Sequence, residues 1–221
     1  MFYPKLTRRK KYSVKQDGTF YADYLHYREE IHEDCQSRCV YCDIQLHEHG
    51  GEGFHLDHFR PQHLFEDLKR TPFNLVLACP KCNILKTKHW PLPVNVGLDA
   101  SHNGEIGFID PFKEIQTDYY RVERDGSISS LKAPGDWVIS LLQLNRESRT
   151  QVRRSRIQRK TTHDFELHVQ KLLAEIEDLL GEPVPDVDSI TMKMRLARFI
   201  QDIIVEISHN LESLLAECQS A

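Results

Sequence analysis

The sequence predicts an α+β protein in which a small zinc-stapled core of short strands and one helix precedes a mainly helical C-terminal region. Two Cys-x-x-Cys pairs, Cys39 with Cys42 and Cys79 with Cys82, have the spacing of a structural site in which four thiolates bind one zinc ion. A strand pattern lies between the two pairs, and from Trp137 onward the apolar spacing is that of helices. We therefore expect the zinc site to fasten a compact core.

The composition excludes a membrane protein. Of the 221 residues, 40% are hydrophobic, and no run approaches the roughly 18 to 20 apolar residues that cross a bilayer. Residues 1–15 lack the apolar stretch of a secretory signal, so we expect a cytoplasmic protein. The net charge is −4, but residues 164–221 hold 12 acidic and 4 basic residues, whereas residues 1–163 hold 25 basic and 21 acidic residues. This distribution predicts a basic body and an acidic tail.

Three regions are expected along the chain: a basic N-terminal arm over residues 1–20, a core over residues 21–145 and a helical region over residues 146–221. The arm lacks clear periodicity and ends at a turn at Asp17-Gly18, so we expect a loosely packed segment that could grip phosphates. The core is expected to begin with a helix over Tyr21–Asp34, which leads to the first cysteine pair.

A strand pair and a helix are expected between and after the cysteine pairs. Apolar and polar residues alternate over Phe54–Phe59, which predicts a half-buried strand with His55 and Asp57 on the face opposite His58. The apolar run Leu75–Ala78 follows, and Pro80 suits the first turn of a helix. The predicted order is therefore cysteine pair, strand pair, cysteine pair, helix.

The second half of the chain contains a hairpin signal and two helical stripes. Short strands are expected over Gly104–Leu131, with a turn at Asp125-Gly126. Gly181–Pro185 interrupts the later helical pattern. Leu172, Ile176, Leu179 and Leu180 precede this break, and Ile200, Ile203, Ile204, Ile207, Leu211 and Leu214 follow it. Their spacing predicts a helical hairpin within residues 146–221.

Asp57 and His58 have the chemistry expected of a site that hydrolyses phosphodiester bonds. An imidazole such as that of His58 can act as general base near neutral pH, and Asp57 offers a hard oxygen ligand for magnesium or manganese. Asn83 offers an amide oxygen to the same ion, and Lys86 lies one helical turn further along the same face. We expect Lys86 to contact the substrate backbone.

The sequence closely resembles the HNH nuclease superfamily, which has a ββα-metal fold. The resemblance rests on the first cysteine pair, on His55-Leu-Asp57-His58-Phe-Arg-Pro61, on Asn74-Leu-Val and on Cys79-x-x-Cys82-Asn83-x-x-Lys86. It implies that Asp57 and Asn83 bind a catalytic Mg²⁺ or Mn²⁺ and that His58 is the base. It also implies that Asn74 orients the site and that Cys39, Cys42, Cys79 and Cys82 bind a structural Zn²⁺. Asn83 replaces the usual His, so the chain is expected to be an HNN variant.

A further resemblance extends to bacterial HNH proteins of retron and Septu-type anti-phage systems. It rests on the motifs above together with Trp90-Pro91, Asp110-Pro111 and Leu144-Asn145-Arg146. It implies defence against invading double-stranded DNA, with an ATPase partner or a second copy of the chain on the C-terminal helices. The residues expected to contact nucleic acid are His55, Arg60, Lys86 and Lys88.

Several alternatives remain open at this stage. The chain could be a non-catalytic zinc module that binds nucleic acid or protein, or a subunit whose helical tail carries the function. His55 either faces substrate or forms a hydrogen bond within the hairpin. The basic run over Arg153–Lys160 is either a solvated surface or a DNA contact. Cys35 and Cys218 are expected to be small buried residues.

Overall fold

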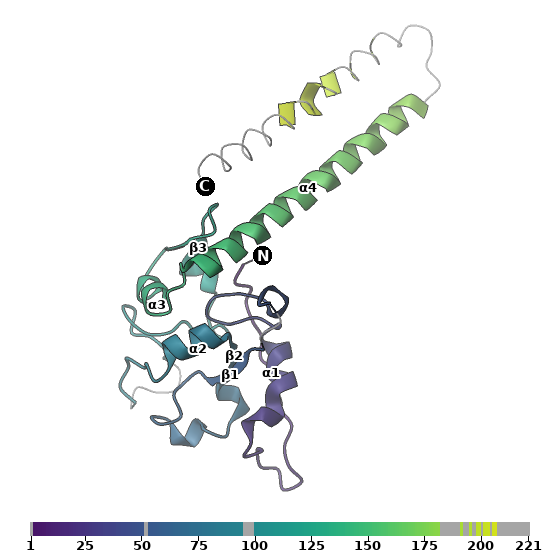
Figure 1. Cartoon of the computed structure of the whole chain (residues 1–221). Helices are drawn as coiled ribbons and strands as arrows, with labels where there is room; N and C mark the ends of the chain where they lie inside the picture. The colour runs from purple at the N-terminus through teal and green to yellow at the C-terminus, as the bar shows by residue number, and fades with distance from the viewer. Residues whose placement is uncertain are drawn as a thin grey trace. The chain divides into compact units, whose positions relative to one another are not determined.

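A computed structural model describes residues 2–50, 53–94 and 100–181, and in the C-terminal segment residues 191, 195, 198–199, 201–203 and 205–206. The chain divides into two compact units, Met1–Arg159 and Lys160–Ala221, and each is described by itself. The first unit holds both strand pairs and both cysteine pairs (Figure 1). This mixture of helices and strands fits the α+β class that the sequence predicts.

A strand pair and one helix form the centre of the first unit. Strands β1 (His55–His58) and β2 (Leu75–Ala78) are antiparallel, with His55 opposite Ala78 and His58 opposite Leu75. Helix α2 (Pro80–Lys86) follows at once, with Cys79 as its N-cap and Pro80 at its first position, as expected. Helices α1 (Arg28–Asp34) and α2 flank the strand pair (Figure 1). Because both faces of the pair are covered, every residue of β2 is buried.

The loop between β1 and β2 contains two short 3₁₀ helices, η3 (Glu66–Leu68) and η4 (Pro72–Asn74). Two further 3₁₀ helices come before β1 in the sequence: η1 (Tyr24–Tyr27), directly before α1, and η2 (Leu46–Glu48), after the first cysteine pair. Helix η1 begins at Asp23, whose carboxylate accepts a hydrogen bond from the amide of Leu25.

The N-terminal segment packs on the core, so the expectation of a loosely packed arm is wrong. Tyr3, Leu6 and Tyr12 are buried, and the guanidinium of Arg9 forms ion pairs with Glu30, Glu33 and Asp34 of α1. Arg9 is therefore engaged with carboxylates of the same chain. The segment is held in place because its aromatic side chains are buried and because Arg9 forms several ion pairs with α1.

The second strand pair confirms the hairpin signal at Asp125-Gly126. Strands β3 (Tyr120–Val122) and β4 (Ile128–Ser130) are antiparallel and enclose this turn. Gly126 has a φ of +84°, and a Cβ atom there would lie 2.2 Å from the carbonyl oxygen of Thr150, so only glycine fits. The 3₁₀ helix η5 (Gln116–Asp118) precedes β3, and helix α3 (Gly135–Leu141) follows β4.

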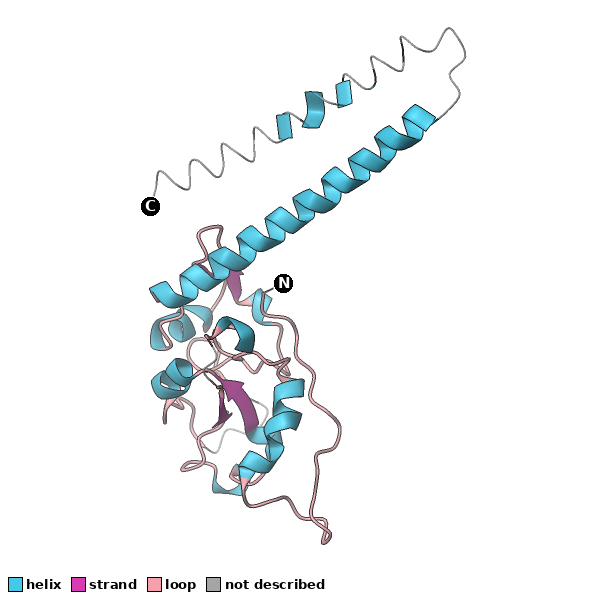
Figure 2. Ribbon diagram, turned by 45° about the vertical axis from the view of Figure 1, so that its right-hand side comes forward, coloured by secondary structure: helices cyan, strands magenta, loops and turns pink. Residues whose placement is uncertain are grey.

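Helix α4 (Glu147–Gly181) begins in the first unit and is the longest element of the described chain (Figures 1 and 2). Residues 182–190 lie outside the described residues, so the predicted break at Gly181–Pro185 stays a prediction. Arg149 and Arg153 are buried, and Arg156 forms ion pairs with Asp43 and Glu48. These arginines are therefore internal contacts of the first unit, whereas Arg154 and Arg159 are exposed. Neither solvent nor DNA, the two partners expected for this basic run, is the partner of Arg156.

Within the second unit, Nε2 of His168 on α4 lies 3.3 Å from Oε2 of Glu206. This contact is consistent with a helical hairpin, which stays a prediction because most of its apolar stripes lie outside the described residues. Cys218 also lies outside them. In the part of the chain that is described, no helix is both long and apolar enough to cross a membrane.

Candidate active site and metal centres

The four paired cysteines converge on one point. Their Sγ atoms lie within 4.8 Å of one another, and all four side chains are buried. Cys39 begins a turn that is closed by a hydrogen bond from the amide of Asp43 to the carbonyl oxygen of Cys39. Cys79 and Cys82 lie at the start of α2. Hydrogen bonds from the other three cysteines lower the pKa of Cys79. Four buried sulfur donors at this spacing fit a structural zinc ion.

Two arginines, Arg146 directly before α4 and Arg149 in its first turn, lie against the cysteine cluster. The guanidinium of Arg146 lies 3.5 Å from Sγ of Cys82 and 3.7 Å from Sγ of Cys79, and that of Arg149 lies 3.6 Å from Sγ of Cys79. Four thiolates around one Zn²⁺ would carry a net charge of about −2, which two guanidinium groups would balance. No local signal in the sequence indicates this contact, because the arginines follow the cysteines by more than sixty positions.

The carboxylate of Asp57 is buried against two donors. The hydroxyl of Tyr41 donates to Oδ2 at 2.6 Å, and Nζ of Lys86 lies 3.1 Å from Oδ2 and 3.2 Å from Oδ1. Burial and then the charge of Asp57 raise the pKa of Tyr41, which keeps its hydroxyl protonated and donating. Nζ of Lys86 also donates to the carbonyl oxygen of His58 at 2.8 Å.

The predicted substrate contact of Lys86 is therefore wrong. Its side chain has no exposed surface, because its ammonium satisfies Asp57 and His58 inside the protein. Arg60 is also buried; its guanidinium donates to the carbonyl oxygen of Ala100 and lies over the ring of Trp90. Of the four residues expected to bind nucleic acid, His55 and Lys88 are exposed.

His55 on β1 and Asn83 on α2 contact each other; they precede Asp57 and Lys86 on the same two elements. Nδ2 of Asn83 lies 3.1 Å from Nδ1 of His55 at the surface. This hydrogen bond joins β1 to α2, so it is not the bond within the hairpin that the sequence offered for His55, and a contact of the exposed His55 with substrate stays a prediction. His55 and Asp57 share one face of β1, and Asn83 and Lys86 occupy successive turns of α2. The oxygens of Asp57 and Asn83 are hard donors, whose chemistry fits Mg²⁺ or Mn²⁺.

His58 ends β1 with its ring fixed between two partners. Nε2 lies 2.9 Å from the carbonyl oxygen of Lys69, and the ring of Tyr24 meets it edge-on at 5.3 Å between centroids. A carbonyl oxygen only accepts, so Nε2 carries the hydrogen, and in the neutral form of the imidazole Nδ1 is then the nitrogen that carries the lone pair. The arrangement supplies an oriented proton acceptor at Nδ1.

Asn74 clamps the loop that follows His58. Its Oδ1 accepts from the amide of Arg60 and its Nδ2 donates to the carbonyl oxygen of Arg60, both at 2.9 Å. The amide of Phe59 also donates to the carbonyl oxygen of Asn74 at 2.8 Å. Three hydrogen bonds thus fix the backbone directly after His58.

A cavity of about 670 Å³ lies behind this clamp. Its lining includes Arg8, Arg60, Asn74 and Phe112, but not Asp57, His58 or Asn83. The candidate hydrolytic groups therefore lie outside this cavity. Asp57 and His58 are both buried, and Asn83 is half-buried.

The comparisons with known proteins agree with this geometry. Residues 39–89 match the family model described as HNH endonuclease, a range that includes both cysteine pairs, β1, β2 and α2. No curated protein and no solved structure matches the chain. The matched region is an HNH endonuclease domain, which indicates a nuclease-type function.

Proposed function

We propose that the chain is a metal-dependent HNH endonuclease that hydrolyses phosphodiester bonds in double-stranded DNA. The observation that carries the proposal is the orientation of His58: its Nε2 hydrogen is directed to the carbonyl oxygen of Lys69, so in the neutral imidazole Nδ1 is the nitrogen that can accept a proton. It stands beside Asp57 on β1, in a domain that matches the HNH family.

In this mechanism His58 takes a proton from the attacking water at Nδ1. Asp57 and Asn83 would hold a Mg²⁺ or Mn²⁺ ion, which when bound polarises the phosphate and stabilises charge on the leaving oxygen. Asn74 keeps the backbone of Arg60 in place and so positions His58. The zinc site contributes no chemistry and holds the strand pair and α2 together.

The proposal is tested with supercoiled plasmid, linear duplex DNA and RNA, each incubated with Mg²⁺, with Mn²⁺ and with chelator. The zinc content is measured in the same samples, because a chelator that removed structural zinc would also stop cleavage. Metal-dependent cleavage of duplex DNA is the expected result. Cleavage of RNA alone would overturn the assignment of DNA as the substrate. If zinc-loaded protein cleaved none of the substrates, the proposal that the chain is an endonuclease would be overturned.

His58→Ala should lower the cleavage rate by about 10²-fold or more while the zinc content and the fold are retained, because the base is lost. Its thermal stability should fall modestly, because the carbonyl oxygen of Lys69 loses its hydrogen-bond partner. His63→Ala is the matched control, since His63 is exposed in the same loop and has no role in this mechanism. Rates are measured from the nicking of plasmid. Equal rates for His58→Ala and the control would exclude His58 as base.

A non-catalytic zinc module is the second candidate. The contacts of Asp57 favour it, because a carboxylate paired with a buried ammonium and a hydroxyl is also what a purely structural core contains. Such a module would bind nucleic acid with unchanged affinity in His58→Ala and would cut nothing. The cleavage assay therefore separates the two candidates.

We extend the proposal to the acidic residues 164–221, as a docking segment for an ATPase partner or a second copy of the chain in a cytoplasmic defence against invading DNA. The support is their charge of 12 acidic against 4 basic residues, which disfavours contact with a polyanion. Removing residues 164–221 should leave the rate of DNA cleavage unchanged and abolish assembly, as measured by light scattering and co-purification. Loss of DNA binding with assembly intact would contradict this division of roles.

A further inference from the structure

The buried ammonium of Lys86 occupies an unusual place in the candidate active site. It lies within 3.2 Å of both carboxylate oxygens of Asp57 and 2.8 Å from the carbonyl oxygen of His58, with the ring of Phe108 at 5.8 Å. Its side chain has no exposed surface. All three of its donors thus have partners, and all three acceptors belong to Asp57 and His58, the residues proposed as metal ligand and base.

Asp57 has little capacity left for a further cation. A carboxylate offers about four lone-pair positions, of which Lys86 uses two and the hydroxyl of Tyr41 uses one. A divalent ion bound to the remaining position would lie a few ångströms from a positive charge that no water screens. The repulsion between the two cations is strong in such a buried setting.

We propose that Lys86 is an internal counter-ion that competes with the divalent metal for Asp57, so that it sets the metal concentration at which the site becomes loaded. This inference rests on the proposed function only in taking Asp57 as a metal ligand. When the metal binds, the ammonium gives up the carboxylate and keeps the carbonyl oxygen of His58 and the ring of Phe108 as partners. Lys86 is then a positioning residue that acts through Asp57.

A role in which Lys86 favours metal binding would change the affinity for metal in the other direction. If Lys86 only held Asp57 in the orientation that binds metal, its removal would weaken binding. If it competes, its removal tightens binding. The sign of one measured change therefore decides between the two roles, without any reference to catalysis.

The test is a titration of the zinc-loaded full-length protein with Mn²⁺ in the absence of nucleic acid, with free Mn²⁺ measured by electron paramagnetic resonance. Lys86→Met removes the charge and retains an unbranched side chain of similar length, so we expect the Kd for Mn²⁺ to fall at least tenfold. Lys86→Arg retains the charge and should show no tightening. Lys81→Met is the matched control, because Lys81 is exposed on the same helix, and its Kd should equal that of the wild type.

Adding Asp57→Asn to Lys86→Met should abolish the tight site, which assigns the bound Mn²⁺ to Asp57. Unchanged or weaker Mn²⁺ binding by folded Lys86→Met would overturn the inference. A second measurement uses the wild type, so its result does not depend on whether a variant folds. The nitrogen resonance of the Lys86 ammonium should shift on addition of Mg²⁺, and a resonance that stays unchanged while Mg²⁺ binds would also overturn it.

Failure of this inference and failure of the proposed function give different results. Wild-type cleavage of DNA together with unchanged Mn²⁺ binding by Lys86→Met supports the nuclease and overturns the competition. Tighter Mn²⁺ binding by Lys86→Met together with a wild type that cuts no nucleic acid supports the competition and overturns the nuclease.

Discussion

The candidate base depends on main-chain atoms of the loop between β1 and β2. His58 is oriented by the carbonyl oxygen of Lys69, and the backbone directly after it is fixed by Asn74. A single side chain, Asn74, therefore determines whether both ends of this loop keep their positions. Its carboxamide supplies one donor and one acceptor at the right spacing for one peptide segment, which no other side chain except glutamine can do.

Asn74→Ala should lower the free energy of unfolding by about 1–3 kcal/mol, because the buried amide and carbonyl groups of Arg60 lose their partners. The cleavage rate should fall as well, since the peptide after His58 is no longer fixed. Urea denaturation of zinc-loaded protein measures the first effect and plasmid nicking the second. A loss of stability below about 0.5 kcal/mol would show that the clamp contributes no more than an ordinary surface residue.

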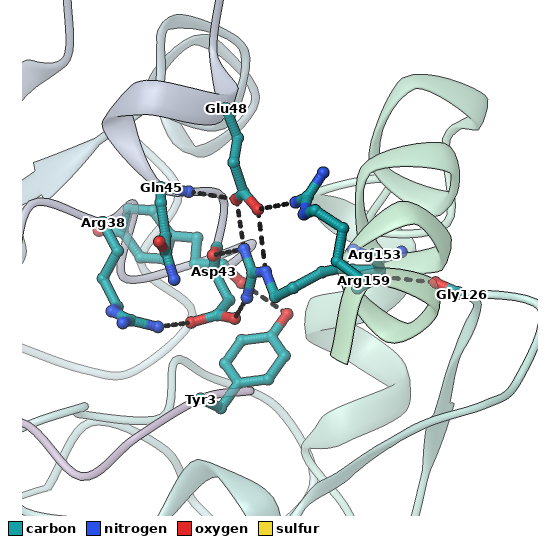
Figure 3. A network of polar contacts seen from close by, with 10 residues as sticks. Tyr3, Arg38, Asp43, Gln45, Glu48, Gly126, Arg153 and Arg159 are labelled. Carbon is teal, nitrogen blue, oxygen red and sulfur yellow. Dashed lines mark hydrogen bonds and ion pairs between the residues drawn. The ribbon is translucent and has the colours of Figure 1, made fainter. Parts of the chain in front are cut away.

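Among the elements, the first turns of α4 contact two regions that are far apart in the sequence, the β3–β4 turn and the segment that follows the first cysteine pair. Arg153 donates to the carbonyl oxygen of Gly126 in the β3–β4 turn, and Arg156 pairs with Asp43 and Glu48 beside the first cysteine pair (Figure 3). Arg38 also pairs with Asp43, so one carboxylate joins two arginines. The helix is thus fastened to the zinc-binding loop by several charged groups at once.

Arg156→Ala should lower the free energy of unfolding by about 3 kcal/mol, because it leaves the buried carboxylates of Asp43 and Glu48 short of a partner. Arg159→Ala is the matched control: Arg159 contacts the same Glu48, but 64% of its side chain is exposed, so its removal should cost less than about 0.5 kcal/mol. Chemical denaturation at neutral pH measures both. Equal losses in the two variants would contradict a special role for Arg156.

The same network should make stability depend on pH. Burial raises the pKa of Glu48, but hydrogen bonds from Arg156 and from the amide of Gln45 outweigh it, and the net pKa is lowered. A carboxyl group with a lowered pKa stabilises the fold above its unfolded value of about 4.3. This stabilisation is lost as the pH falls through the folded pKa, and Arg156→Ala should show a smaller loss over that range.

At the scale of the whole molecule, the cysteine cluster joins segments that are far apart in sequence. The sulfurs come from both cysteine pairs, and the guanidinium groups around them come from Arg146, directly before α4, and from Arg149 in its first turn. Because each of these segments is short, a zinc ion bound to the four sulfurs would replace core that they do not provide by themselves.

Cys39→Ser should therefore lose zinc and unfold the first unit. Binding of a structural zinc ion is worth about 10–16 kcal/mol, which is comparable with the whole stability of a domain at about 5–15 kcal/mol. Metal analysis and circular dichroism measure the two losses. Cys35→Ser is the control, because Cys35 is buried outside the cluster, where its sulfur only accepts from the amide of Leu77. A folded, zinc-free Cys39→Ser protein would contradict this prediction.

Local signals in the sequence were sufficient for much of this architecture. The cysteine spacing, Pro80 at the start of α2 and Asp125-Gly126 in the hairpin each act within a few residues, and the cysteine cluster and these elements are confirmed. The alternation around Asp57 predicted the strand correctly but not its half-buried character, because Leu56, Asp57 and His58 are all buried. Cys35 is buried, as expected. The roles assigned to Asp57, His58, Asn74 and Asn83 stay predictions.

The errors concern charged side chains whose partners are distant in sequence. Nothing near Lys86 shows that its ammonium will be buried against Asp57, and nothing near Arg156 shows that Asp43 lies beside it. A basic residue in a helix looks the same in sequence whether it meets solvent, DNA or a carboxylate. Only the tertiary packing distinguishes these cases, which is why nucleic-acid contacts were predicted for Lys86 and for the segment around Arg9.

The packing of the N-terminal segment has a consequence for biosynthesis. The ring of Tyr3 packs on that of Tyr120, and the amide of Leu6 donates to the carbonyl oxygen of Pro111. At about 5–20 residues per second, a ribosome adds the intervening residues over roughly 6 to 24 s. During that interval the nascent chain already carries Asp57 and His58, but not the segments on which its N-terminal residues pack. We expect the newly made chain to acquire its ordered centre only after Arg146 and the first turns of α4 have been synthesised.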